Sequence, residues 1–150
     1  MKILVMNGPN LNLLGVREPD IYGKETYESL LEKISSHANL RGVDVKFVQS
    51  NHEGALVDAI HQAFYEGMDG IVMNPGAYTH TSVALLDALK ATRLPAVEIH
   101  ISDPDTRESF RHVSYVRAAC IATVAGHGMN GYLEALDILV DYLNKQSKER

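Results

Sequence analysis

Amide, imidazole and hydroxyl side chains are concentrated between residues 74 and 82, where the sequence reads Asn-Pro-Gly-Ala-Tyr-Thr-His-Thr-Ser. An apolar run precedes this segment and a helix-like stretch from Val83 to Leu89 follows it, which is typical of a turn between a strand and a helix. Thr79 or Thr81 can cap that helix, whose first N–H groups can bind a negative charge. The amide and the imidazole could equally be helix-cap residues, but together they predict a pocket for an anionic or polyhydroxylated small molecule.

Side chains that can transfer protons occur at two further places. Glu98 and His100 are two residues apart in an apolar run, so on a strand they share one face. A carboxylate so placed can fix the imidazole tautomer needed for proton transfer, although the two could also be only a pair at the rim of a sheet. Tyr22 can act as a base near neutral pH only if a cation such as Arg17 stabilises its phenolate; otherwise it is a packing tyrosine.

Short apolar runs that suit buried strands alternate with segments of helical periodicity. The expected strands span residues 2–6, 43–48, 70–73, 96–100 and 118–124, and the expected helices span residues 26–39, 53–66, 82–91, 107–115 and 131–144. Such alternation predicts parallel strands joined by right-handed crossovers, with helices on both faces of the sheet. We therefore expect a single domain over residues 1–150, an α/β flavodoxin-like three-layer sandwich with a five-stranded parallel sheet.

Polar residues follow the expected strands at the end where ligands bind in open parallel sheets. The first strand leads to Asn10 and to a long non-periodic loop over residues 8–24, which contains Arg17 and Tyr22. We expect four of the five strand ends to meet in one pocket.

Composition narrows the possible partners. The 150 residues are 45% hydrophobic, enough for one core, and the net charge of -5 argues against binding to nucleic acid or to an anionic membrane. No apolar run approaches the roughly 20 residues that span a bilayer, and the first residues read as a strand, so we expect a cytoplasmic protein. The single cysteine, Cys120, is interpreted as a buried structural thiol. Seven histidines are present, but no grouping of the kind that binds zinc and no glycine-rich phosphate loop.

Several separated motifs resemble those of the type II 3-dehydroquinate dehydratases, from the first strand to the last helix. They are ILVMNGPNLNLLGVREPDIYG (3–23), NPGAYTHTSVALLDAL (74–89), EIHISD (98–103), FRHVSY (110–115) and GHGMNGY (126–132). The resemblance implies a flavodoxin-like fold, trimers assembled into a dodecamer, and no metal or organic cofactor.

The reaction that this resemblance implies is the dehydration of 3-dehydroquinate to 3-dehydroshikimate, by anti elimination through an enolate. It belongs to the shikimate pathway, which leads to chorismate and the aromatic amino acids. By resemblance, Tyr22 is the base and Arg17 lowers its pKa. His100 is the general acid and Glu98 orients it. Asn10 stabilises the enolate oxygen through an ordered water or positions Tyr22.

The same resemblance implies how the substrate is bound. Asn74 and the backbone N–H groups of Ile101 and Ser102 are expected to bind its carboxylate, while His80 and Arg111 contact its ring hydroxyls.

Asp87 is expected to reach into the pocket of a neighbouring subunit, and the loop over residues 15–23 is expected to close over the substrate. The sequence departs from the family pattern locally. Leu86 stands where many members have an arginine, Asp103 where an asparagine is common, and the strand around Cys120 is atypical.

Two other kinds of function remain possible on the residues alone. One is a non-catalytic flavodoxin-like module that senses a small carboxylate or a flavin, although no Trp and only three Phe are available to stack on a flavin ring. The other is a metal-dependent hydrolase that uses His80, His100 and His127.

Overall fold

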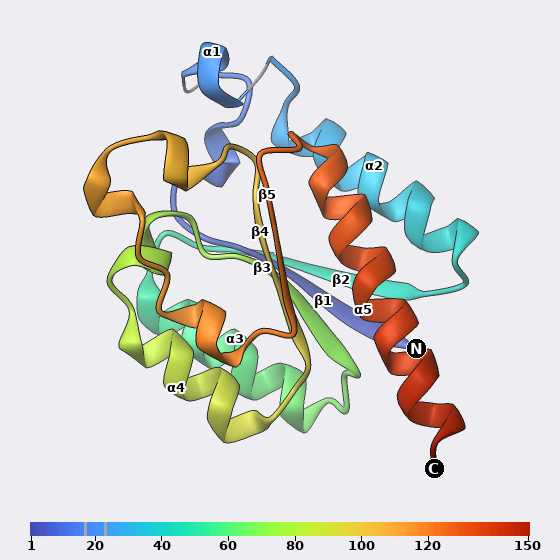
Figure 1. The fold of residues 1–150 in the computed structure, drawn as a ribbon. Helices are drawn as coiled ribbons and strands as arrows, with labels where there is room; N and C mark the ends of the chain where they lie inside the picture. The colour runs from blue at the N-terminus through green and yellow to red at the C-terminus, as the bar shows by residue number, and fades with distance from the viewer. Residues whose placement is uncertain (17, 23) are drawn as a thin grey trace.

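The computed structural model of the chain describes residues 1–16, 18–22 and 24–150, and at Pro19 and Tyr22 it describes the backbone alone. Within these residues one parallel sheet has the strand order β2-β1-β3-β4-β5 (Figure 1). The strands are β1 (Lys2–Asn7), β2 (Asp44–Gln49), β3 (Gly70–Asn74), β4 (Ala96–His100) and β5 (Ala122–Ala125). The five-stranded parallel sheet expected from the sequence is confirmed.

Helices cover both faces of this sheet (Figure 1). On one face lie α2 (Tyr27–Leu40) and α5 (Asn130–Lys148), and on the other lie α3 (Glu53–Tyr65) and α4 (Val83–Thr92). The layers confirm the α/β three-layer fold. No helix within the described residues is both long and apolar enough to cross a bilayer.

The alternation of side chains along β1 explains how one sheet supports two cores. Ile3 and Val5 belong to the cluster under α2 and α5, whereas Leu4 and Met6 belong to the cluster under α3 and α4. All four are buried, and full burial of a side chain of this size contributes about 1.5–3 kcal/mol relative to exposure. The central strands are therefore apolar on both faces, as the sequence indicated.

The helix that follows residues 74–82 begins differently from the sequence prediction. Ser82 caps α4, because its Oγ accepts a hydrogen bond from the N–H of Leu85 at 3.0 Å. Neither Thr79 nor Thr81 is the cap. Residues Gly76–His80 form a 3-10 helix, η2, so Thr79 lies within η2 and Thr81 follows its last residue. The Thr79 hydroxyl instead turns inward and is fully buried.

Two elements near the C-terminal half were predicted wrongly. The expected helix over residues 107–115 is only a 3-10 turn, η4 (Ser109–Arg111), which follows another, η3 (Pro104–Thr106). Pro104 and the Asp103 cap favour short turns here, and Phe110 is exposed rather than packed on a core. β5 begins at Ala122 instead of residue 118, because Val116–Ala119 form a 3-10 helix, η5.

Short helices also occupy the long loop after β1. They are η1 (Leu11–Leu13) and α1 (Pro19–Tyr22), each too short to show periodicity in the sequence. Cys120, just after η5, is half-buried and its Sγ donates to the carbonyl of Val116. Burial raises the pKa of its thiol to about 12, which agrees with a structural role.

Candidate active site

Two glycines let the loops after β1 and β3 touch. The N–H of Gly8 donates to the carbonyl of Asn74 at 2.8 Å, and a Cβ on Gly8 would lie 2.2 Å from the carbonyl oxygen of Pro75. Gly76 has φ of 59° and lies against Pro9, so a side chain there would be strained. Only glycine permits this approach, which places both loops on one pocket.

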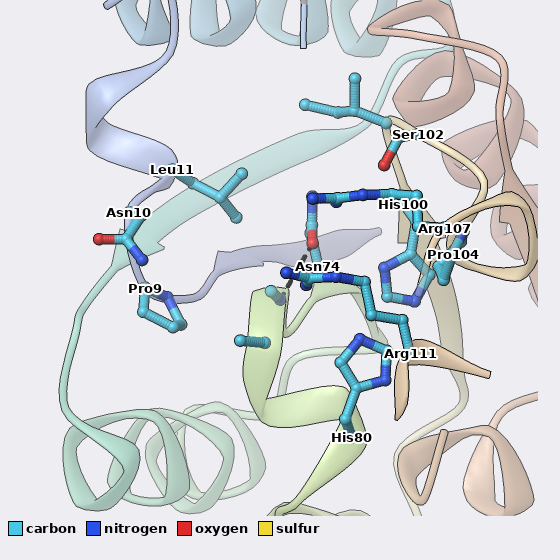
Figure 2. Close-up of a pocket in the computed structure, with 13 residues that line it drawn as sticks. Pro9, Asn10, Leu11, Asn74, His80, His100, Ser102, Pro104, Arg107 and Arg111 are labelled. Carbon is cyan, nitrogen blue, oxygen red and sulfur yellow. Dashed lines mark hydrogen bonds between the residues drawn. The ribbon is translucent and has the colours of Figure 1, made fainter. Parts of the chain in front are cut away.

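The pocket lies at the carboxyl end of the sheet, and Figure 2 shows the loop after β1 on one side of it and His80, His100 and Arg111 on the other. Its lining comprises Pro9, Asn10, Leu11, Asn74, Gly76, Ala77, His80, His100, Ile101, Ser102, Pro104, Arg107 and Arg111. The structure thus brings together seven of the residues singled out from the sequence: Asn10, Asn74, His80, His100, Ile101, Ser102 and Arg111.

Glu98 and His100 form a buried pair beneath this pocket. His100 Nε2 lies 2.7 Å from Glu98 Oε1, and the carboxylate is fully buried. The pair therefore belongs to the interior rather than to an exposed rim. Other donors complete the carboxylate's hydrogen bonds: the hydroxyls of Thr79 and Ser114 at Oε1, and Arg117 Nε and the Thr123 hydroxyl at Oε2.

These partners decide the charge of the pair. Burial alone would raise the pKa of the Glu98 carboxyl, but the hydrogen bond and charge of His100, with the donors from Ser114 and Arg117, outweigh it and hold that pKa well below its ordinary value. An ionised carboxylate only accepts hydrogen bonds, so His100 Nε2 carries a hydrogen. Nδ1 is then the nitrogen left to give a proton to a ligand in the pocket.

The side chain of Asn74 is oriented by a buried tyrosine. Tyr132, on α5, donates its hydroxyl hydrogen to Asn7 Oδ1 at 2.6 Å and accepts from Asn74 Nδ2 at 2.8 Å. Asn74 Oδ1 accepts from the N–H of Gly76 at 3.1 Å. Because a backbone N–H can only donate, this fixes which end of the amide is oxygen, and the second hydrogen on Nδ2 is left as a donor for a ligand.

Backbone donors lie beside that amide. The N–H groups of Ile101 and Ser102, which follow the end of β4, have no hydrogen-bond acceptor within the described residues. A carboxylate offers several lone pairs and binds well to a cluster of N–H donors. With the free hydrogen of Asn74, this wall of the pocket therefore suits a carboxylate.

His80, unlike these donors, offers the pocket a hydrogen-bond acceptor. Its Nδ1 donates to the carbonyl of Val113 at 2.7 Å, which leaves Nε2 as an acceptor in the neutral ring. Burial lowers the pKa of His80, and the nearby His100 and Arg111 add to this, whereas the hydrogen bond to Val113 opposes it. His80 is therefore neutral at pH 7 and can accept a hydrogen bond from a hydroxyl.

Two arginines complete the pocket. Arg111 Nε donates to Glu108 Oε2 at 2.5 Å, and its guanidinium lies 5.0 Å from the ring centroid of Phe110. Arg107, which the sequence reasoning did not single out, also lines the pocket, and its Nη2 lies 4.0 Å from Glu18 Oε2. Its spacing of four residues from Arg111 is a signal that could have drawn attention to it.

Other residues expected in the site are placed differently or not described. Arg17 lies outside the described residues, and so does the side chain of Tyr22, whose backbone ends α1. Asn10 lines the pocket, as expected, but it is exposed, with φ of 69°, and its N–H donates to Asn51 Oδ1 at 3.0 Å. Asp87 is exposed on α4 and does not line the pocket of its own chain.

The three histidines considered for a metal site do not gather. His127 is exposed and bonds Glu134 at 2.6 Å, whereas His80 and His100 bond Val113 and Glu98. In the part of the chain that the structure describes, no group of three His, Cys, Asp or Glu side chains could bind a metal ion. The hydrolase hypothesis therefore has no supporting cluster.

Fold and pocket together define an α/β protein of flavodoxin-like architecture, with a pocket lined by amide, imidazole and guanidinium side chains at the carboxyl ends of the strands. Residues 1–140 match the family model for dehydroquinase class II, and the chain belongs to this family. The resemblance seen in the motifs is confirmed.

Relatives of known name agree with this. The chain is 50% identical over 143 residues to a 3-dehydroquinate dehydratase from Caldicellulosiruptor bescii, covering 95% of this chain and 99% of the relative. It is 54% identical over 140 residues to one from Corynebacterium glutamicum strain R, covering 93% and 96%. The crystal structure of a type II dehydroquinase from Butyrivibrio crossotus superposes with a TM-score of 0.91 at 49% identity, covering 93% of this chain and 97% of that one.

Proposed function

We propose that this protein is a hydro-lyase that removes water from 3-dehydroquinate to give 3-dehydroshikimate in the shikimate pathway, on the route to chorismate and the aromatic amino acids. Relatives about half identical over nearly their whole length carry the name 3-dehydroquinate dehydratase. The observation that supports the chemistry most strongly is the 2.7 Å hydrogen bond between His100 and the buried Glu98, beside a pocket lined with N–H donors.

In this proposal His100 is the general acid. Nε2–H is committed to Glu98, so the proton for the departing hydroxyl leaves from Nδ1. Glu98 stays ionised and stabilises the imidazolium before transfer, as well as fixing the ring orientation. The substrate's C–O bond breaks, and the hydroxyl leaves as water with the proton from His100.

The other half of the reaction is assigned to Tyr22 and Arg17. Tyr22, as a phenolate, takes the proton from the carbon next to the ketone and leaves an enolate. The permanent charge of Arg17 stabilises that phenolate. Asn10 stabilises the enolate oxygen through an ordered water or positions Tyr22. The enolate then re-forms the ketone as the hydroxyl departs, which gives the enone product with no oxidant or reductant.

Substrate recognition follows from the donors and acceptors of the pocket. Asn74 Nδ2 and the N–H groups of Ile101 and Ser102 are proposed to bind the carboxylate. The neutral His80 accepts from one ring hydroxyl, and Arg111 donates to another. In this assignment Asn74 donates and His80 accepts, which are the roles that their hydrogen bonds within the protein leave open to them.

We further propose that the protein acts as a single domain over residues 1–150 in the cytoplasm. Because the elimination is redox-neutral and side chains serve both proton transfers, it is proposed to need no metal or organic cofactor.

Assembly of trimers into a dodecamer would give Asp87 a function, since this exposed side chain does not line the pocket of its own chain. Mixing Asp87→Ala subunits with His100→Gln subunits tests this. If Asp87 acts on a neighbour's pocket, some pockets of the mixed oligomer combine both intact residues and activity returns. Absence of recovery, with a sizing measurement that proves mixing, would contradict the shared pocket.

The direct test of function is incubation of the purified protein with 3-dehydroquinate while the enone absorbance is followed. We expect a steady increase. The Tyr22→Phe variant should bind substrate but give almost no increase, because it lacks only the proton acceptor. No increase with the wild-type oligomer would reject the function, and an active Tyr22→Phe variant would reject the role of Tyr22.

A further inference from the structure

Arg117 reaches the acid pair from outside the pocket. It lies on η5, its side chain is 42% exposed, and its Nε donates to Oε2 of the fully buried Glu98 at 2.9 Å. It does not line the pocket, so it has no direct access to a ligand there. Its bond is to the carboxylate oxygen that His100 does not use.

The charge balance around Glu98 changes during the proposed reaction. Before proton transfer the carboxylate has two cationic partners, the imidazolium of His100 and the guanidinium of Arg117. After transfer His100 is neutral, whereas a guanidinium keeps its charge. Loss of the remaining cation would raise the pKa of the Glu98 carboxyl, because desolvation disfavours the ion and only the hydrogen bonds from hydroxyls such as Ser114 would then oppose it.

We infer that Arg117 is a positioning residue for His100: its guanidinium keeps the buried Glu98 carboxylate ionised throughout turnover, so that the transferable proton stays on the imidazole. This inference rests on the proposed role of His100 as the general acid. If Glu98 were protonated, a neutral carboxyl would face a neutral imidazole. That ring is a much poorer acid than the imidazolium.

No other charged group in the described surroundings can replace Arg117 at Glu98. The hydroxyls of Thr79, Ser114 and Thr123 are neutral donors. On the same side as η5, Cys120 is a neutral thiol, since burial raises its pKa to about 12.

The pocket side offers no replacement either. His80 is neutral at pH 7 because burial lowers its pKa, and Arg107 and Arg111 face the ligand space around His100. Among the described residues, the hydrogen bonds to Glu98 from charged side chains come from His100 and Arg117.

Three substitutions separate charge from hydrogen bonding. Arg117→Gln keeps a donor without the charge, Arg117→Met removes both, and Arg117→Lys keeps the charge. We expect the first two to lower kcat roughly tenfold, part of the roughly 100- to 10,000-fold that general acid–base catalysis contributes, with KM within about twofold of wild type. A limb of the pH–rate profile should move to higher pH, because the pair holds its proton more tightly. Arg117→Lys should restore most of kcat and the wild-type profile.

Two further variants act as references. Arg93→Gln, at the exposed arginine that follows the last residue of α4, should leave kcat and the pH profile unchanged. Thr123→Val removes a neutral bond from the same Glu98 oxygen, so it should move the profile less than Arg117→Gln. An unchanged profile in Arg117→Gln, or an equal shift in Thr123→Val, would overturn the inference.

Acid unfolding gives a readout that does not depend on activity. The lowered pKa of Glu98 stabilises the folded protein above the ordinary value of 4.5, and this stability is lost as pH falls from there through the folded pKa. Arg117→Gln should show a smaller fall in unfolding free energy over that range than wild type. An equally steep fall would overturn the inference. Inactive wild-type protein would reject the proposed function, whereas an active wild type with unaltered Arg117 variants would reject this inference alone.

Discussion

The hydroxyl of Tyr132 accepts a hydrogen bond from Asn74 Nδ2 at 2.8 Å across 58 positions of sequence, and both side chains are buried. Burial raises the pKa of Tyr132, so its hydroxyl keeps its hydrogen and donates it to Asn7. Because the hydroxyl hydrogen of Tyr132 goes to Asn7, the hydroxyl oxygen can only accept from Asn74, and the Asn74 amide must turn its Nδ2 towards it. Tyr132 on α5 and the N–H of Gly76 thereby together orient the amide of Asn74 beside the pocket.

Replacement of Tyr132 should therefore weaken both stability and substrate binding. Tyr132→Phe leaves a buried acceptor on Asn7 and a donor on Asn74 without their partner, which costs about 1–3 kcal/mol of unfolding free energy. KM should rise more than kcat falls, because Asn74 is proposed to bind substrate. Denaturant unfolding and steady-state kinetics measure the two effects. Tyr142→Phe, on the same helix, is the control and should change neither; equal behaviour of the two variants would contradict the role of Tyr132.

The charge of Glu98 should appear in both rate and acid stability. Glu98→Gln cannot stabilise the imidazolium, so kcat should fall about 100-fold or more. Its unfolding free energy should also fall less than that of wild type as the pH drops below 4.5, because the lowered pKa of Glu98 contributes stability only while the group is ionised. Equal slopes of stability against pH in the two proteins would show that the carboxylate is not held ionised.

Loss of His80 should affect binding rather than chemistry. His80→Ala removes the acceptor for one hydroxyl, and a hydrogen bond of about 0.5–1.5 kcal/mol corresponds to a rise in KM of up to about tenfold. The matched control is His61→Ala, at an exposed histidine of α3. A fall in kcat with an unchanged KM would assign His80 to the proton transfer instead.

The close approach of the two glycine loops can be tested by adding one methyl group. Gly8→Ala would place a Cβ 2.2 Å from the Pro75 carbonyl, so both stability and activity should fall. Gly54→Ala, within α3 and with open space around it, should instead stabilise the protein by roughly 0.5–1 kcal/mol. Urea unfolding compares the two, and a Gly8→Ala variant as stable as wild type would show that the loops need not touch.

Local patterns in the sequence predicted the parts of the fold that obey simple periods. Two-residue periodicity placed Glu98 and His100 on one face of a strand, and their hydrogen bond confirms it. The alternation of apolar runs with helical segments predicted all five strands, with β5 four residues too long at its start. The end of a parallel sheet then indicated where the pocket would lie.

Features that depend on contacts between distant segments could not be predicted in this way. Tyr132 lies 125 positions from Asn7, and nothing near it in the sequence marks it as a partner of the site. Arg117 stands in the short 3-10 helix η5, whereas the sequence predicts a helix that ends at residue 115 and a strand that begins at residue 118. Threonine is a residue type that often caps helices, but the Thr79 hydroxyl donates to Glu98 instead, because a buried carboxylate is a stronger acceptor.

The central claim, that His100 delivers the proton in the dehydration of 3-dehydroquinate, is tested most directly by the rate of enone formation in His100→Gln. Glutamine cannot supply a proton, so we predict a fall in kcat of roughly 100- to 10,000-fold with KM changed little. The fold should be intact, because Glu98 keeps its bonds to Arg117, Thr123 and Ser114. A variant that retained more than about a tenth of the wild-type kcat would contradict the account.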